Sequence, residues 1–132
     1  MVLFFWRKMM TINPTHKSFS ELLSQRFQDA WQKGHGGNPD EAHILIGDKS
    51  IALILPGAMV KAETALFNKS SNTRVLDQYL RSVLEMVAED LSSLIEDYFG
   101  REVKQVIPLI DLKAGWITAF YRFHDQAEDQ HE

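Results

Sequence analysis

Residues 42–57 read AHILIGDKSIALILPG, and this stretch decides the fold. Two short runs rich in β-branched and aliphatic residues, 42–46 and 51–55, flank a spacer of turn-forming residues. This pattern predicts a β-hairpin. The second run is apolar at every position, which favours a central strand covered on both faces. Pro56 and Gly57 then end the strand.

A second hairpin is predicted at the end of the chain. Its strands are expected at 103–112 and 116–123, joined by a turn at 113–115 that contains a glycine. Pro108 has no N–H group to donate. It is therefore expected at a bulge, or with its nitrogen directed away from the ladder, as on an edge strand.

Two shorter helices are predicted from capping and periodicity. Ser18 and Glu21 form a capping-box pattern, which predicts a helix over 19–33. A second helix is expected over 59–68, before a polar break in the chain. Together with the hairpins, these segments alternate helix and sheet along the chain.

The strongest helical pattern covers residues 73–99, and Gly100 is its expected end. Val75 and Tyr79 belong to its apolar side and are expected to be buried. At 1.5 Å per residue the helix would be about 39 Å long. That length is large for so small a domain and indicates that part of the apolar stripe packs against a second subunit.

The element order α-β-β-α-α-β-β predicts an α+β fold. Two hairpins and three helices favour a two-layer architecture, an antiparallel four-stranded sheet with its helices on one face. We expect one domain over 18–124, because the whole chain has 132 residues. Residues 1–17 are expected to be a flexible or locally packed segment, and 125–132 an acidic flexible tail.

Composition excludes several classes of function. There is no cysteine, which excludes disulfides, thiolate metal sites and cysteine nucleophiles. The formal net charge of −4 argues against nucleic-acid binding. The five histidines include no i,i+4 pair and no HExxH motif, so no metal site is predicted. No nucleophile–base spacing indicates an enzyme, and no cofactor is expected.

The N-terminus combines six apolar residues, 1–6, with the basic pair Arg7 and Lys8. Six residues are too few to span a bilayer, and the charge follows the apolar run, unlike in a signal peptide. Two interpretations stay open: a weak interfacial contact of residues Met1 to Lys8 with a membrane, or local packing. Translation could also start at Met9 or Met10.

The stretch KGHGGNP, residues 33–39, resembles a phosphate-binding loop only in composition. It follows a predicted helix and precedes a strand, which is the reverse of the arrangement in nucleotide-binding loops. It is better explained as the end of a helix, with Gly34 in a left-handed conformation and Pro39 preventing further helix. His35 has no role in this explanation.

Two polar residues interrupt apolar segments. Arg81 could anchor a small anionic ligand in a pocket between sheet and helices, or could pair with Asp77 and Glu85. Asp111 could be a second anchor, or could simply lie on the exposed side of its strand. The aromatic residues of the last strand form a candidate association surface, which comprises Trp116, Phe120, Tyr121 and Phe123.

The order of four motifs resembles the MpsC-like family, long catalogued as a domain of unknown function. These motifs are AHILIGDKSIALILPG, AETALFNKS, LIEDYFGREV and LIDLKAGWITAF. The namesake of the family belongs to a sodium-translocating, membrane-potential-generating system. The family turn reads Gly-x-Gly-Pro, whereas Gly37 and Asn38 are inserted here. The matching positions are Gly34, Gly36, Pro39, Glu63, Leu66, Arg81, Gly100, Asp111 and Phe120.

The resemblance implies a small soluble accessory or regulatory protein linked to a membrane ion or inorganic-carbon transport system. It implies protein–protein contacts, a homodimer, a possible transporter subunit as partner, and a cytoplasmic location with the option of peripheral membrane contact. It transfers no catalytic residues. The alternative hypothesis is a sensor of small anionic ligands.

Overall fold

The computed structural model describes residues 14–39, 41–69 and 73–124. These residues form an α+β fold with the predicted order α-β-β-α-α-β-β. In chain order, the elements are α2 (Pro14–His35), β1 (His43–Ile46), β2 (Ser50–Leu55), α3 (Lys61–Lys69), α4 (Thr73–Phe99), β3 (Val103–Asp111) and β4 (Trp116–Phe123).

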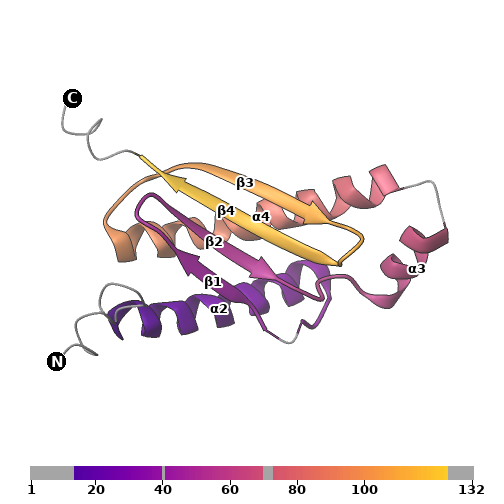
Figure 1. Cartoon of the computed structure of the whole chain (residues 1–132), viewed down its shortest axis with the longest axis horizontal. Helices are drawn as coiled ribbons and strands as arrows, with labels where there is room; N and C mark the ends of the chain where they lie inside the picture. Colours follow the sequence, from indigo (N-terminus) through magenta and orange to yellow (C-terminus); the bar gives the residue numbers. More distant parts are fainter. Residues whose placement is uncertain (1–13, 40, 70–72, 125–132) are drawn as a thin grey trace, which may run out of the picture.

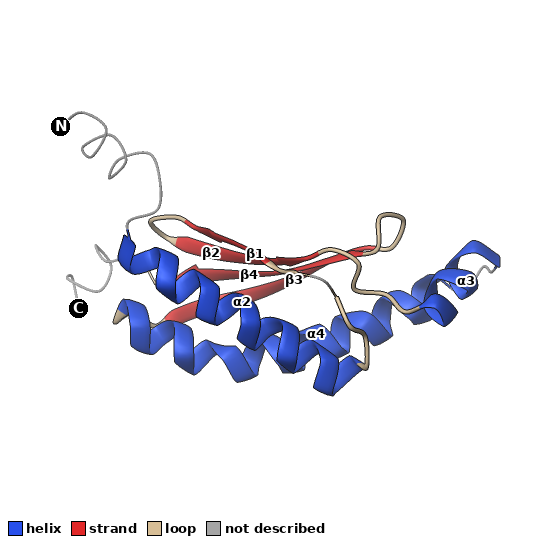
Figure 2. Cartoon of the chain, turned by 90° about the horizontal axis from the view of Figure 1, so that it is seen from below, coloured by secondary structure: helices blue, strands red, loops and turns tan. Residues whose placement is uncertain are grey.

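The four strands form one antiparallel sheet in the order β1-β2-β4-β3 (Figure 1). β1 and β3 are its edges, so the prediction that Pro108 lies on an edge strand is confirmed. The central position of β2 is also confirmed. The prediction that β2 is covered on both faces is wrong, because the described helices that pack on the sheet lie on only one side of it (Figure 2).

The core lies between the sheet and helices α2 and α4 (Figure 2). Alternate residues of β2 and β4 point into it: Ile51, Leu53, Leu55, Ile117, Ala119, Tyr121 and Phe123. The hydroxyl of Tyr121 donates to the Ala88 carbonyl of α4 at 2.6 Å. Burial, with a smaller contribution from the Asp90 carboxylate, raises the pKa of Tyr121 above its usual value.

Helix α2 begins at Pro14, and the predicted start after Ser18 is wrong. Proline is compatible with the first turn of a helix because the N–H groups there have no intrahelical acceptor. Tertiary contacts hold the added turn. The Phe19 ring stacks on the Tyr98 ring of α4 at 3.8 Å, and His16 Nδ1 lies 2.9 Å from the Tyr98 hydroxyl. These contacts outweigh the local capping preference of Ser18.

Helix α4 ends at Phe99 as predicted, and Gly100 adopts a positive φ of 65°. Its first turns extend past the sheet, where α3 lies beside them (Figure 1). Val75 is therefore 62% exposed and Tyr79 46% exposed, which corrects the prediction that both are buried. Periodicity identifies the apolar side of a helix but not how far its packing partner extends.

None of the helices in the described ranges has a stretch long and apolar enough to cross a membrane. Residues 1–13 and 125–132 lie outside the described residues. The expectations for the contact of Met1 to Lys8 with a membrane, for the start at Met9 or Met10 and for the acidic tail concern that part of the chain.

Candidate functional site

The histidine at the end of α2 is the centre of a buried polar cluster. The His35 side chain is fully buried, and its ring stacks on Trp31 with centroids 4.4 Å apart. Its Nδ1 accepts a hydrogen bond from the Gly37 N–H at 3.0 Å. The proton of the neutral ring is therefore on Nε2, which donates to the Glu63 carboxylate at 2.9 Å. We call these four residues the His35 clasp.

The His35 clasp joins the end of α2 to the start of α3. Glu63 also accepts from the Val60 N–H at 3.1 Å, and the Trp31 indole donates to the Ala58 carbonyl at 3.1 Å. A Cβ atom on Gly37 would lie 2.8 Å from His35 Nδ1, so only glycine allows this approach. These contacts give the cluster a structural role.

The helix ends later than the sequence predicted. Gly36, with φ of 95°, has the left-handed conformation assigned to Gly34, and its N–H donates to the Gln32 carbonyl at 2.9 Å. The helix continues to His35 because that side chain is held by Trp31 and Glu63. Glu63 lies 28 residues further along the chain, and no local pattern connects the two.

Arg81 joins α4 to the edge strand β3. Its Nη1 donates to the Pro108 carbonyl at 2.8 Å, and its Nη2 lies 3.2 Å from the Asp77 carboxylate. The N–H and C=O positions of one strand residue face the same side in an antiparallel sheet. Pro108 therefore directs both its nitrogen and its bound carbonyl away from β4, as predicted for the nitrogen.

Asp111 closes the turn between β3 and β4, where its Oδ1 accepts from the Ala114 N–H at 3.1 Å. A shallow groove of about 580 Å³ beside Asp111 is lined also by Arg74, Asp77 and Lys113, so charges of both signs face it. Arg81 and Asp111 thus have partners within the fold, and the structure does not bring them together as two anchors of one pocket.

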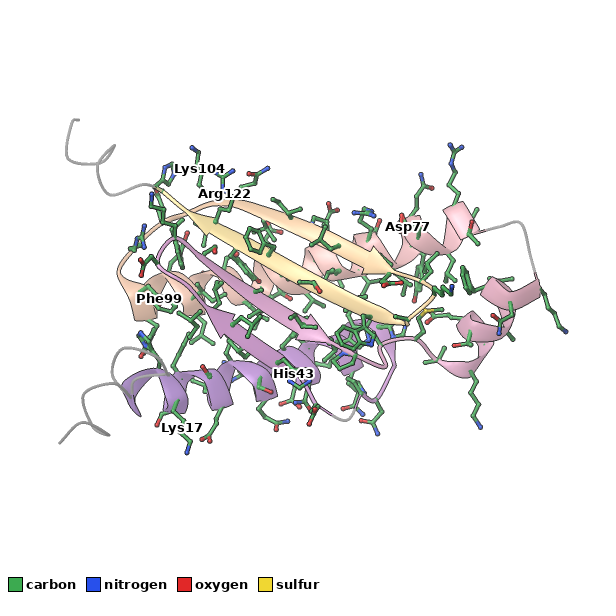
Figure 3. All side chains as sticks on the ribbon, viewed as in Figure 1. Lys17, His43, Asp77, Phe99, Lys104 and Arg122 are labelled. Atoms are coloured by element: carbon green, nitrogen blue, oxygen red, sulfur yellow. The ribbon has the colours of Figure 1, made fainter. Side chains whose placement is uncertain are left out.

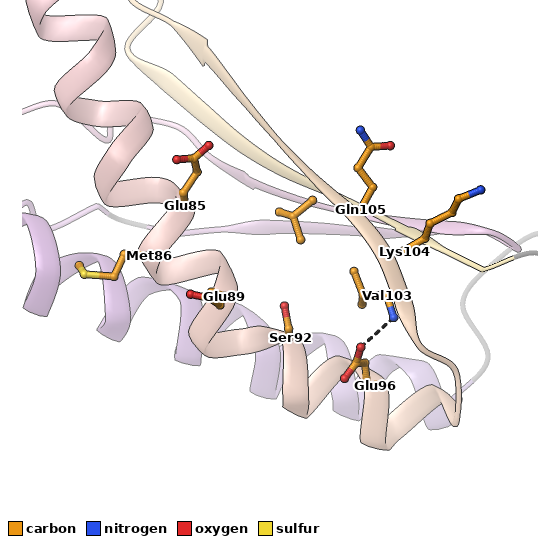
Figure 4. A pocket seen from close by; sticks show the side chains of 9 residues that line it. Glu85, Met86, Glu89, Ser92, Glu96, Val103, Lys104 and Gln105 are labelled. Atoms are coloured by element: carbon orange, nitrogen blue, oxygen red, sulfur yellow. Dashed lines mark hydrogen bonds between the residues drawn. The ribbon is translucent and has the colours of Figure 1, made fainter.

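A second groove, of about 440 Å³, runs between α4 and β3 (Figure 4). Three glutamates of α4 line it: Glu85, Glu89 and Glu96. Glu96 accepts from the Val103 N–H at 2.8 Å and so ties the end of α4 to the start of β3. Glu85 and Glu89 are exposed.

The sheet face opposite the helices carries large apolar side chains beside polar ones such as His43 and Thr118, and none of the described elements covers it (Figure 2). Leu45 is 59% exposed, Leu109 51% and Trp116 45%. The strand registers place them on one face with further apolar residues. We call this set the bare sheet face: Leu45, Ile54, Ile107, Leu109, Trp116 and Phe120.

The candidate association surface of the last strand divides between the two faces of the sheet. Trp116 and Phe120 lie on the bare sheet face, while Tyr121 and Phe123 are buried against the helices. Only the first pair is available to a partner of the folded chain. At one end of the bare sheet face, Arg122 donates to the Gln105 side chain at 3.0 Å, so the apolar area has a polar margin.

Within the described ranges, no three His, Cys, Asp or Glu side chains are grouped so that they could hold a metal ion. A family model described as "Na+-translocating membrane potential-generating system (MpsC)" matches residues 15–124. The chain belongs to the MpsC family. Comparisons with curated proteins and with solved structures found no match. In this MpsC chain, Glu63 belongs to the His35 clasp, and the positive-φ glycines Gly36 and Gly100 follow the ends of α2 and α4.

Proposed function

We propose that this MpsC chain is a non-enzymatic accessory or regulatory protein of a sodium-translocating membrane system. In this proposal it works in the cytoplasm, as a homodimer, through protein–protein contacts at the membrane surface. The family description supplies the link to sodium translocation. The bare sheet face supports a role in contacts rather than in chemistry.

The bare sheet face is the observation that carries this proposal. A sheet in a two-layer domain normally turns its second face, lined with polar side chains, to water. Here all four strands contribute apolar residues to that second face. Contiguous exposed apolar surface of this kind marks an interaction site. We assign it to a membrane subunit of the sodium-translocating system, with Phe120 near the centre of the contact and Trp116 at the end beside the β3–β4 turn.

Charged substitution on the bare sheet face tests this assignment. We expect Leu109→Lys to abolish co-sedimentation of the chain with vesicles that contain the sodium-translocating system. Val75→Lys is the matched control, since Val75 is at least as exposed but lies on α4, away from this face. Both variants should fold, because neither side chain is buried.

Sodium uptake by the same vesicles gives the second measurement. We expect the wild-type chain and Val75→Lys to change the uptake rate equally, and Leu109→Lys to leave it at the level without added chain. Equal binding by the two variants, or no binding by the wild type, would overturn the assignment of this face.

A further inference from the structure

The two edges of the sheet differ in the backbone groups that they present. On β3, Pro108 has no N–H, and its carbonyl is bound by Arg81. A register irregularity between Val103 and Gln105 further disrupts that edge. Natural sheets use prolines, bulges and charged side chains to prevent strand addition at an edge. β3 is therefore protected.

β1 is less protected: in the described part of the chain, only the Ala42 carbonyl, next to the strand, is bound on this side, by the Ser24 hydroxyl of α2 at 3.2 Å. The Gly47 N–H donates to the Ser50 carbonyl at 2.8 Å, which makes this the first hydrogen-bonded pair of the hairpin. Alternation along the register then directs the backbone groups of His43 and Leu45 toward β2. The N–H and C=O groups of Ile44 and Ile46 point outward, and no residue in the described ranges is their partner.

A groove of about 400 Å³ lies beside this edge, between β1 and α2. Ser20 of α2 lines it, and the Ser20 hydroxyl is buried without a hydrogen-bond partner among the described residues. Lys17 and Glu21 line the groove on the same side, and Figure 3 shows Lys17 and His43 along one long side of the molecule. An edge strand beside a helix-walled groove is the geometry in which domains bind an added strand.

We propose that β1 of a second copy of this chain pairs antiparallel with β1, and that the two sheets form one continuous eight-stranded sheet. The β1 edge suits a two-fold axis because each copy offers the donors and acceptors that the other lacks. An axis at Ile44 pairs Ile44 with its own copy and Ala42 with Ile46 of the second copy. This register uses the outward groups of Ile44 and Ile46, and the Ala42 carbonyl would accept a second hydrogen bond beside that from Ser24.

The charges of α2 favour the same occupant. Lys17 and Glu21 are four residues apart and project into the groove. A two-fold axis sets the two α2 helices antiparallel, so that Lys17 of each copy faces Glu21 of the other. The unpartnered Ser20 hydroxyl then faces the polar side of the second α2. The two bare sheet faces become one surface, which doubles the area offered to a membrane partner.

This inference gives the interface of the homodimer proposed above and rests on that part of the proposed function. Its test uses the absence of native cysteines. His43 and Leu45 of opposite copies form a non-hydrogen-bonded pair, whose Cβ atoms are about 4.5–5.5 Å apart in antiparallel sheets. That spacing is close to what a disulfide needs. Both side chains are exposed, so the full-length variants His43→Cys and Leu45→Cys should fold.

We expect a mixture of the two variants, mildly oxidised, to give the mixed disulfide severalfold in excess of either homodisulfide. The matched control mixes Leu45→Cys with Leu109→Cys, which is equally exposed on the same face but at the other edge. This control should give no excess of mixed product. A dimer in light scattering without the selective product overturns the β1 interface alone. A monomer overturns the homodimer as well, and neither result bears on the contact of the bare sheet face.

Amide exchange at single residues identifies any other occupant. In the dimer, the Ile44 and Ile46 amides should become protected as the chain concentration rises, while those of His43 and Leu45 are protected throughout. Protection of Ile44 that does not depend on concentration, and that is lost when residues 2–13 are deleted, would assign the edge to the N-terminal segment of the same chain and overturn the inference.

Discussion

Replacement of His35 by alanine should destabilise the fold far more than replacement of any exposed histidine. His35→Ala leaves the Gly37 N–H without its acceptor, and an unpaired buried N–H costs about 1–3 kcal/mol. It also removes a hydrogen bond to the Glu63 carboxylate, worth about 1.5–3 kcal/mol. Loss of the stack on Trp31 adds about 0.5–1.5 kcal/mol.

These contributions are not fully additive, since Glu63 keeps the Val60 N–H and part of its contact with water. We therefore expect the free energy of unfolding to fall by about 3 kcal/mol, with a decrease in Tm of about 10 °C for a chain of this size. Urea denaturation followed by circular dichroism at 222 nm measures the change. It also reports m, which should stay constant if the native state keeps its compactness.

His43→Ala is the matched control, because His43 is an exposed histidine of β1 whose ion-pair partner, Glu41, is also exposed. Its effect should be below about 0.5 kcal/mol. Glu63→Gln keeps an acceptor for His35 Nε2 and removes only the charge, so a loss of about 1 kcal/mol is expected. The reasoning would be refuted if His35→Ala cost less than about 1 kcal/mol, or no more than the His43 variant.

Three further predictions follow from single contacts. Gly37→Ala should cost about 1–3 kcal/mol in urea denaturation, because the added Cβ displaces the His35 ring and breaks the bond between them; a neutral result would contradict the clasp. Arg81→Ala should cost about 1–2 kcal/mol by the same assay, since the Pro108 carbonyl loses a charged donor; an unchanged midpoint would show that this bond contributes nothing. For Tyr121→Phe, the loss at pH 8 should be about 1 kcal/mol. Above pH of about 10, unfolded tyrosine ionises while folded Tyr121 stays protonated. The difference in free energy of unfolding between wild type and variant should therefore fall by about 1.4 kcal/mol per pH unit. A difference that stays constant with pH would contradict the raised pKa.

The element order could be predicted because each element carries its own local signal. The hairpin at 42–57 has strong turn chemistry, and α4 has a long apolar period ended by Gly100. The bounds of α4 were therefore predicted correctly. The start of α2 could not be predicted, because the contacts of Phe19 and His16 with Tyr98 join segments about 80 residues apart.

The division of β4 into two faces shows a different limit. The run WITAFYRF has apolar side chains at both parities, so the alternation that normally identifies the buried face is ambiguous. The charge of Arg122 was the available clue. A charged side chain is expected on the face turned to solvent, and Trp116 and Phe120 lie on the same face of the strand as Arg122.

The candidate site was only partly predictable. Arg81 and Asp111 were candidate ligand anchors, and in the structure each has a partner within the fold. The His35 clasp was missed because its members come from α2, the following turn and α3. The one available signal was a histidine between glycines with no role in a helix end.

β2 and β4 carry apolar residues on both faces, and this affects association as well as prediction. A sheet with two apolar faces needs a covering layer on each, and the described helices supply one. A polar residue in place of Ile54 or Leu109 would lower the exposed apolar area without loss of core contacts, because neither side chain belongs to the core. The retained apolar residues are therefore better explained by association than by folding. In the proposed dimer the protected β3 edges become the two outer edges of the continuous sheet, so growth stops at two copies and the bare sheet faces stay open to the membrane partner.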